Sequence, residues 1–84
     1  MSRLSRKENV IAGLLAASGE MYGLELVKAS DGRLKRGTIY VTLNRMEDKG
    51  LVISRKEDVR PKHGGLKRRL YTLTDKGRSL WRSK

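Results

Sequence analysis

The segment RGTIYVTLNRMEDKGLV, at positions 36–52, constrains the fold more than any other part of this 84-residue chain. With about 100° of rotation per residue in a helix, Leu43 and Met46 return to within about 40° of Ile39. These three residues form one apolar stripe, while small and polar side chains occupy the opposite side. The pattern predicts a helix over about Arg36 to Lys49 with one face packed on a core.

A β-hairpin is predicted to follow that helix. Gly50 suits the left-handed conformation that closes a helix, and the short β-branched run Leu51 to Lys56 is typical of a strand. Glu57 to Lys67 contains the only proline of the chain and two successive glycines, which indicates a loop. Arg68 to Leu73 is predicted to return as the second strand, so we expect a hairpin with a long tip.

Two helices are predicted before this segment and one after it. Ser5 to Glu8 has the S-x-x-E spacing of a capping box, which starts a helix that ends in Ser18 to Glu20. A second helix is predicted from about Tyr22 to Ala29, and a last one, capped by Thr74, from Asp75 to about Arg82. The side chains expected to pack are Val10, Ile11, Leu14 and Leu15, then either Tyr22, Leu26 and Ala29 or Leu24 and Val27, and finally Leu80 and Trp81.

Three helices, a hairpin and a short helix are the topology of a winged helix-turn-helix, in which the third helix enters a groove of DNA and the hairpin flanks it. We therefore expect a mostly helical α+β fold and a single domain over residues 1–84. A chain of this length buries only about 60 to 65% of its unfolded surface, so a deep substrate pocket is not expected.

The charge of the chain favours a polyanionic partner. Residues 35–84 hold fifteen basic and five acidic side chains and so carry +10 of the total charge of +11. A field of this size attracts nucleic acid. A merely solubilising surface and an anionic membrane are the alternatives, but no basic amphipathic helix with a broad aromatic face is visible.

The outward side of the predicted third helix carries the candidate DNA-binding residues. Asparagine can pair with adenine and arginine with guanine, and the methyl groups of threonine or valine can touch a thymine methyl. Short side chains also let a helix approach a groove closely. We expect Asp48 to point away from DNA, and Lys35 and Arg36 to be positioning contacts on phosphates. Thr38, at the helix start, either touches a base or holds a phosphate together with backbone N–H groups. The candidates on this helix are Arg36, Thr38, Tyr40, Val41, Thr42, Asn44 and Arg45.

The predicted wing carries a second set of basic candidates, which would reach phosphates or a minor groove. These residues are Arg60, Lys62, His63, Lys67, Arg68 and Arg69. His63 has no partner at metal-ligand spacing, so we assign it at most a phosphate contact. Tyr71 is expected to pack in its strand rather than to stack on bases.

Several classes of function are not expected. One histidine, no cysteine and no carboxylate cluster provide no catalytic constellation, so we predict neither an enzyme nor a metal or cofactor site. No apolar run approaches the roughly 18 residues of a membrane span, and the N-terminus does not have the pattern of a signal peptide. We expect a soluble, cytoplasmic protein.

Three motifs together resemble the PadR family of bacterial transcriptional regulators. They are MYGLEL at 21–26, RGTIYVTLNRMEDKGLV at 36–52 and LYTLTDKGR at 70–78, in the order of that family and near its spacing. The resemblance runs from about Val10 to Trp81. It implies a winged helix-turn-helix that binds duplex DNA as a dimer and usually represses transcription. Val41 and Asn44 stand where the family often has proline and histidine.

The resemblance also implies C-terminal helices that build the dimer and often an effector pocket, whereas this sequence ends at Lys84. We expect a minimal form, with no identifiable effector site, whose homodimer uses the first and last helices. The residues expected at that contact are Leu14, Leu15, Leu80 and Trp81. A basic winged-helix RNA-binding protein and a protein-interaction adaptor remain alternatives to a DNA-binding regulator.

Overall fold

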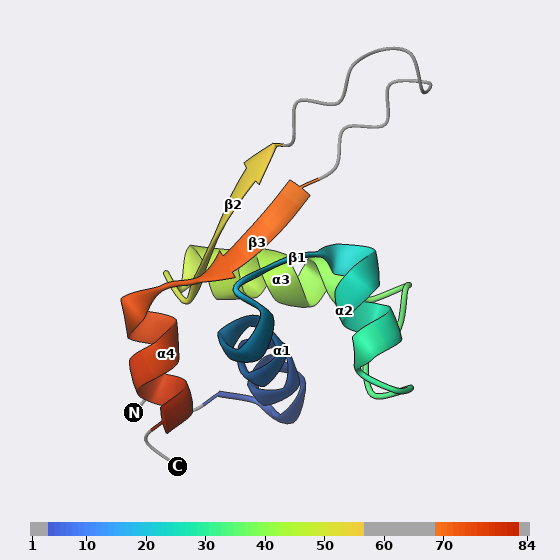
Figure 1. Ribbon diagram of the computed structural model, residues 1–84, viewed down its shortest axis with the longest axis horizontal. Helices are drawn as coiled ribbons and strands as arrows, with labels where there is room; N and C mark the ends of the chain where they lie inside the picture. Colours follow the sequence, from blue (N-terminus) through green and yellow to red (C-terminus); the bar gives the residue numbers. More distant parts are fainter. Residues whose placement is uncertain (1–3, 57–68, 83–84) are drawn as a thin grey trace.

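The computed structural model describes residues 4–56 and 69–82 as a helical body with a small antiparallel sheet (Figure 1). The elements in chain order are α1 (Arg6–Ser18), β1 (Glu20–Tyr22), α2 (Gly23–Ala29), α3 (Ile39–Asp48), β2 (Val52–Lys56), β3 (Arg69–Leu73) and α4 (Asp75–Arg82). Helices α1, α2 and α3 lie below and behind the hairpin strands, and α4 packs on α1. The predicted winged helix-turn-helix fold is confirmed.

The predicted start of α1 is confirmed by both hydrogen bonds of its capping box. The Ser5 N–H donates to Glu8 Oε1 at 2.8 Å, and the Glu8 N–H donates to Ser5 Oγ at 3.2 Å, which is the reciprocal capping box. Gly19, at φ 88°, ends the helix in a conformation that favours glycine. The helix therefore begins and ends where the sequence predicts.

The sheet has one more strand than the sequence predicts. β3 lies in the centre and pairs antiparallel with β2, as expected for the hairpin, and with β1 on its other side. The strand β1 has only three residues, Glu20 to Tyr22, of which Met21 is buried between two more exposed neighbours. Tyr22 was expected in the second helix, but that helix begins at Gly23 because Tyr22 pairs with Leu70 of β3.

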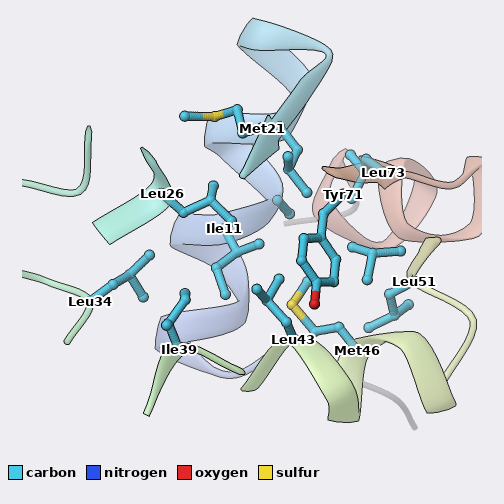
Figure 2. Packing of buried hydrophobic residues seen from close by; sticks show 13 residues of the cluster. Ile11, Met21, Leu26, Leu34, Ile39, Leu43, Met46, Leu51, Tyr71 and Leu73 are labelled. Carbon is cyan, nitrogen blue, oxygen red and sulfur yellow. The ribbon is translucent and has the colours of Figure 1, made fainter. Parts of the chain in front are cut away.

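One apolar core joins the helices to the sheet. The ring of Tyr71 is 1% exposed and points toward Leu43 and Met46 of α3 (Figure 2). Strand packing, as expected for Tyr71, is thus confirmed. The buried apolar side chains are Ile11, Ala12, Leu15, Met21, Leu26, Leu34, Ile39, Leu43, Met46, Leu51, Val52, Tyr71 and Leu73.

The expected packing of the shorter helices is only partly correct. In α2, Leu26 is fully buried, but Ala29 is exposed and Leu24 is 43% exposed, so neither predicted set is buried as a whole. In α1, Ile11 and Leu15 are buried, whereas Val10 and Leu14 pack against the core from its edge. A helix of seven residues with few apolar positions does not define its buried face by periodicity alone.

Helix α4 is fastened to the end of α3 through Thr74. The Thr74 backbone N–H donates to the Leu51 carbonyl at 2.9 Å, and the Thr74 hydroxyl donates to the Gly50 carbonyl at 2.6 Å. The Gly77 N–H in turn donates to Thr74 Oγ1 at 3.0 Å. The predicted cap is confirmed, and Gly77 is buried against Leu51 and Leu73. These hydrogen bonds join the turn after α3 to the start of α4.

A buried carboxylate joins α1 to the end of α3. Lys49 Nζ lies 2.9 Å from Glu8 Oε2, and the Glu8 side chain is 4% exposed while that of Lys49 is half exposed. Burial on its own raises the pKa of Glu8, but hydrogen bonds from the Ser5 backbone and from Lys49 outweigh it and leave the pKa below its usual value. The ionised form of Glu8 therefore stabilises the fold.

Replacing Glu8 by glutamine is expected to lower the free energy of unfolding by about 1 to 2 kcal/mol near neutral pH, because the ion pair with Lys49 is replaced by a weaker hydrogen bond from its ammonium group to a neutral amide. Since the folded-state pKa is lowered, this stabilisation is present above the unfolded pKa and is lost as the pH falls through the folded value. Denaturant titrations of both proteins at several pH values measure the difference, which should shrink in acid. Glu25→Gln is the control, because Glu25 accepts a similar N–H from Tyr22 but is exposed.

Candidate nucleic-acid interface

Helix α3 has one buried and one exposed side. Ile39, Leu43 and Met46 are each at most 1% exposed, which confirms the predicted stripe. On the other side Tyr40 is 45% and Val41 54% exposed, and Asn44 and Arg45 are exposed as well. The core thus fixes the rotation of α3 and presents its polar side to solvent.

The helix is shorter at its start than predicted. It begins at Ile39, and residues 36–38 form a turn in which both the Thr38 and the Ile39 N–H groups donate to the Lys35 carbonyl. Gly37 disfavours helix by about 1 kcal/mol relative to alanine, which explains why the helix does not extend to Arg36. Arg36 and Lys35 are exposed in this turn.

The two threonines of this segment make hydrogen bonds within it. Thr42 Oγ1 donates to the Thr38 carbonyl at 3.3 Å, and Thr38 Oγ1 lies 3.5 Å from the Lys35 carbonyl. Such bonds to the preceding turn fix the side-chain rotamer of a threonine in a helix. The position of the Thr42 methyl group on this surface is therefore fixed too.

Two bonding networks hold the C-terminal end of α3. Lys76 Nζ donates to the Lys49 carbonyl at 2.9 Å, next to the Glu8 ion pair already described. On the other side, Ser54 Oγ donates to Glu47 Oε2 at 2.9 Å. These contacts tie α3 to α1, α4 and β2, so its exposed side is held on a rigid support.

One of the predicted wing candidates, Arg69, lies within the described residues. Arg69 lies in β3, where it pairs with Lys56, and its Nη1 donates to Ser54 Oγ at 3.1 Å. Through Ser54 this arginine is linked to Glu47 of α3, so the stem of the hairpin has a fixed orientation relative to that helix. The candidates that lie outside the described residues are Arg60, Lys62, His63, Lys67 and Arg68.

An open hollow of about 830 Å³ lies between α2, α3 and β3. It is bounded by Arg36 in the turn before α3 and by Tyr40 and Asn44, which lie four residues apart and so share one edge of the helix. Lys28 of α2 and Arg69 of β3 also line it. The hollow thus brings four of the predicted DNA contacts, Arg36, Tyr40, Asn44 and Arg69, together with Lys28 of α2.

The floor of the hollow includes a buried tyrosine. Burial raises the pKa of Tyr71, and the negative charge of Glu47 raises it further, whereas Arg69 acts in the opposite direction. Tyr71 therefore stays neutral at physiological pH. It contributes shape and an apolar surface to the hollow rather than a charge.

Sequence reasoning missed the part of this surface that α2 contributes. Lys28 and Tyr22 were not candidates, because β1 was not predicted and the exposed side of a seven-residue helix has no clear periodicity. Gly23, the first residue of α2, lies directly beneath the Tyr40 ring. The glycine of the motif MYGLEL could have indicated this contact, because it stands at the start of a helix, where most side chains are normally tolerated.

The residues expected at a dimer contact do not all reach the surface. Leu15 is 0% exposed because it packs in the core with Ile11, so it cannot contribute to a subunit contact in this conformation. Leu14, Leu80 and Trp81 pack against the core but are only partly buried. The Trp81 ring lies beside Gly13 of α1, with its Nε1 3.5 Å from where a Cβ atom would stand.

The helices within residues 4–56 and 69–82 are all too short or too polar to cross a membrane.

A comparison with curated proteins gives no match. Residues 11–83 match the model of the transcriptional regulator PadR-like family. The family comparison therefore covers nearly the whole chain.

Solved structures support the same assignment. A PadR family transcription regulator from Clostridium difficile R20291 is 31% identical, with a TM-score of 0.75 over 93% of this chain and 81% of that one. Bacillus subtilis PadR, solved in complex with operator DNA, is 27% identical, with a TM-score of 0.77 over 89% of this chain and 44% of that one.

A third structure shows how widely the fold itself is shared. The PcaV transcriptional regulator from Streptomyces coelicolor is 23% identical, with a TM-score of 0.76 over 94% of this chain and 53% of that one. At this identity the likeness concerns the fold alone. Together with the family match, the α3 surface and the winged architecture lead to one assignment: the chain belongs to the PadR-like family of DNA-binding transcriptional regulators, which are not enzymes.

Proposed function

We propose that the protein is a sequence-specific repressor that places α3 in the major groove of duplex DNA. The observation that carries this proposal is the two-sided character of α3, whose apolar side is locked in the core while Val41, Asn44 and Arg45 face solvent. A helix of this kind fits the major groove, and Asn44 and Arg45 have the hydrogen-bonding groups to read adenine and guanine.

Around this helix, cations would hold the phosphates. Lys35 and Arg36 precede α3, Lys28 and Arg69 line the adjacent hollow, and the basic segment at 57–68 follows β2. Phosphate contacts set the register of a protein on DNA, whereas base contacts select the sequence. The similarity to Bacillus subtilis PadR, solved in complex with operator DNA, supports duplex DNA as the partner.

The proposed form on DNA is a homodimer acting in the cytoplasm. The partly exposed Leu14, Leu80 and Trp81, on α1 and α4, are apolar surface that a second copy would cover. A two-fold symmetric dimer reads two half-sites about one helical turn apart, so the operator should be a palindrome.

Selection from a randomised duplex library tests the specificity and the symmetry together. The expected result is a palindromic site with half-sites separated by about 10 base pairs or a multiple of that spacing. A site without symmetry would contradict the dimer, and failure to enrich any sequence would contradict sequence-specific binding. Competition of the selected duplex with structured RNA then tests the preference for DNA, because RNA that competes equally well would favour an RNA-binding function.

Asn44→Ala and Arg45→Ala are each expected to weaken binding to the selected site about tenfold, since one bidentate base contact discriminates by about 1 to 3 kcal/mol. Binding to unrelated duplex DNA should change much less. Fluorescence anisotropy with both duplexes measures the two affinities. Arg78→Ala is the control, because Arg78 is an exposed arginine on α4. Equal losses for Arg45→Ala and Arg78→Ala would indicate a general charge effect instead of base reading.

A further inference from the structure

The ring of Tyr40 is seated directly on the first residue of α2. A Cβ atom added to Gly23 would lie 2.7 Å from Tyr40 Cε1 and 3.0 Å from both its Cζ and its hydroxyl oxygen. Real Cβ atoms do not approach a side chain so closely, so any residue larger than glycine at 23 would displace the ring. The missing side chain of Gly23 is what gives Tyr40 its place.

Backbone conformation does not explain this glycine. The glycines with positive φ are Gly19, Gly32 and Gly50, at 88°, 89° and 77°, and Gly23 is not among them. Gly23 is the first residue of a helix, where alanine fits the backbone and has the better helix propensity. Folding alone would therefore favour alanine over glycine at position 23.

Nor would the fold suffer much from a shift of Tyr40. The ring is 45% exposed and stands outside the buried core, so it can swing into solvent without opening a cavity. What such a shift would change is the hollow, which Tyr40 lines together with Asn44 of α3 and Arg36 of the preceding turn. The close contact thus serves the exposed surface rather than the core.

We propose that Gly23 is a positioning residue for DNA binding: it lets the Tyr40 ring rest on α2 and thereby form one wall of a seat for the sugar-phosphate backbone. The inference rests on the proposed function, since its ligand is the duplex that α3 reads. The hollow beside Tyr40 is lined by Lys28, Arg36 and Arg69, whose charges suit phosphate.

The Glu25 carboxylate, which also lines the hollow, accepts the Tyr22 N–H at 2.9 Å. This bond holds the acidic group at the backbone of the β1–α2 junction.

The contact with Gly23 holds the Tyr40 ring in one position. A tyrosine held in one position binds more tightly than a mobile one, because less side-chain freedom is lost on binding.

Gly23→Ala is therefore expected to raise the Kd for the selected duplex about five- to tenfold. The midpoint of thermal unfolding should stay the same or rise slightly. Tyr40→Ala should also weaken binding, by about tenfold, because the ring and its hydroxyl are lost. In the Tyr40→Ala background, the further change Gly23→Ala should alter the Kd less than about twofold, since no ring is left to displace.

Gly13→Ala is the matched control. It also places alanine in a helix, and its Cβ would meet Trp81 Nε1 at 3.5 Å, which is ordinary van der Waals contact. Its Kd should equal that of the unmodified protein.

The outcomes separate this inference from the proposed function. If the unmodified protein does not bind duplex DNA, the proposed function itself fails. If it binds and Gly23→Ala or Tyr40→Ala binds equally well, the positioning role is wrong while the function stands. The same conclusion holds if the two substitutions act additively, or if Gly23→Ala lowers the unfolding midpoint as much as it lowers the affinity.

Discussion

Gly77→Ala is expected to destabilise the protein by about 3 kcal/mol, at the upper end of what overpacking a core costs. The added Cβ would lie 2.8 Å from Leu73 Cδ1 and closer still to the Leu51 carbonyl oxygen. That oxygen cannot move away easily, because it accepts hydrogen bonds from the Thr74 N–H and hydroxyl at 2.9 and 3.0 Å. The corner between α3, β2 and α4 would have to open.

Thermal and denaturant unfolding measure this effect. For a domain of this size, a loss of about 3 kcal/mol corresponds to a fall of the midpoint by roughly 12 to 24 °C. The sign of the change distinguishes the two effects. Helix propensity alone would make the Gly77→Ala protein more stable by up to about 1 kcal/mol, whereas the close packing makes it less stable.

Gly37→Ala is the matched control for this prediction. Apart from Gly37 itself and its two chain neighbours, no described residue has an atom within 4 Å of a Cβ built at Gly37, which is exposed in the turn before α3. Its effect on stability should stay within about 0.5 kcal/mol. If Gly77→Ala were as harmless as Gly37→Ala, the close packing of α4 on the Leu51 carbonyl would be wrong.

DNA affinity is expected to fall steeply with salt. Each phosphate neutralised by a cation contributes about −0.9 to the slope of log K against log salt. Contacts from Lys28, Lys35 and Arg36 alone give a slope of about −2.7, which means a loss of about 40-fold between about 50 and 200 mM salt. Basic residues at 57–68 would make the slope steeper.

Replacing these three residues by glutamine tests where the phosphates lie. The triple variant should bind more weakly at low salt, and its slope should be shallower by about 2.7. Arg78→Gln is the control, because α4 lies at the opposite end of the molecule from α2 in Figure 1 and its slope should be unchanged. An unchanged slope in the triple variant would exclude these contacts, and an affinity that hardly varies with salt would contradict DNA binding by the whole protein.

The parts of the fold that the sequence predicts correctly are those encoded locally. The capping box of Ser5 and Glu8 depends on four adjacent residues, and the stripe of Ile39, Leu43 and Met46 on eight. Gly50, at φ 77°, ends its helix for a reason that belongs to glycine alone. In such cases one short segment contains both the cause and the effect.

The parts that were missed depend on segments far apart in the sequence. β1 has three residues and forms because Met21 pairs with Tyr71 of β3. Local strand propensity does not predict this pairing. Glu8 was recognised as a helix cap, but its ion pair with Lys49, 41 residues away, requires the assembled fold. The hollow likewise requires α2, α3 and β3 together.

The candidate site divides in the same way. The exposed side of α3 follows from helical periodicity, so Val41, Asn44 and Arg45 could be found from the sequence. The contact between Gly23 and Tyr40 could not, because it joins two helices whose relative position only the tertiary structure defines. The sequence therefore indicated the exposed side of α3 but not the hollow beside it.

The central position of β3 couples α3 and the hairpin strands to the same core. β3 is the return strand of the hairpin, yet it pairs with β1 from the N-terminal half and supplies Tyr71 to the middle of the core. A growing chain that has reached only residue 56 lacks the strand that pairs with β1 and lacks Tyr71. We therefore expect stable folding only after synthesis has passed Leu73. For the same reason, a wing from another protein could not be grafted onto this chain without rebuilding the core beneath α3.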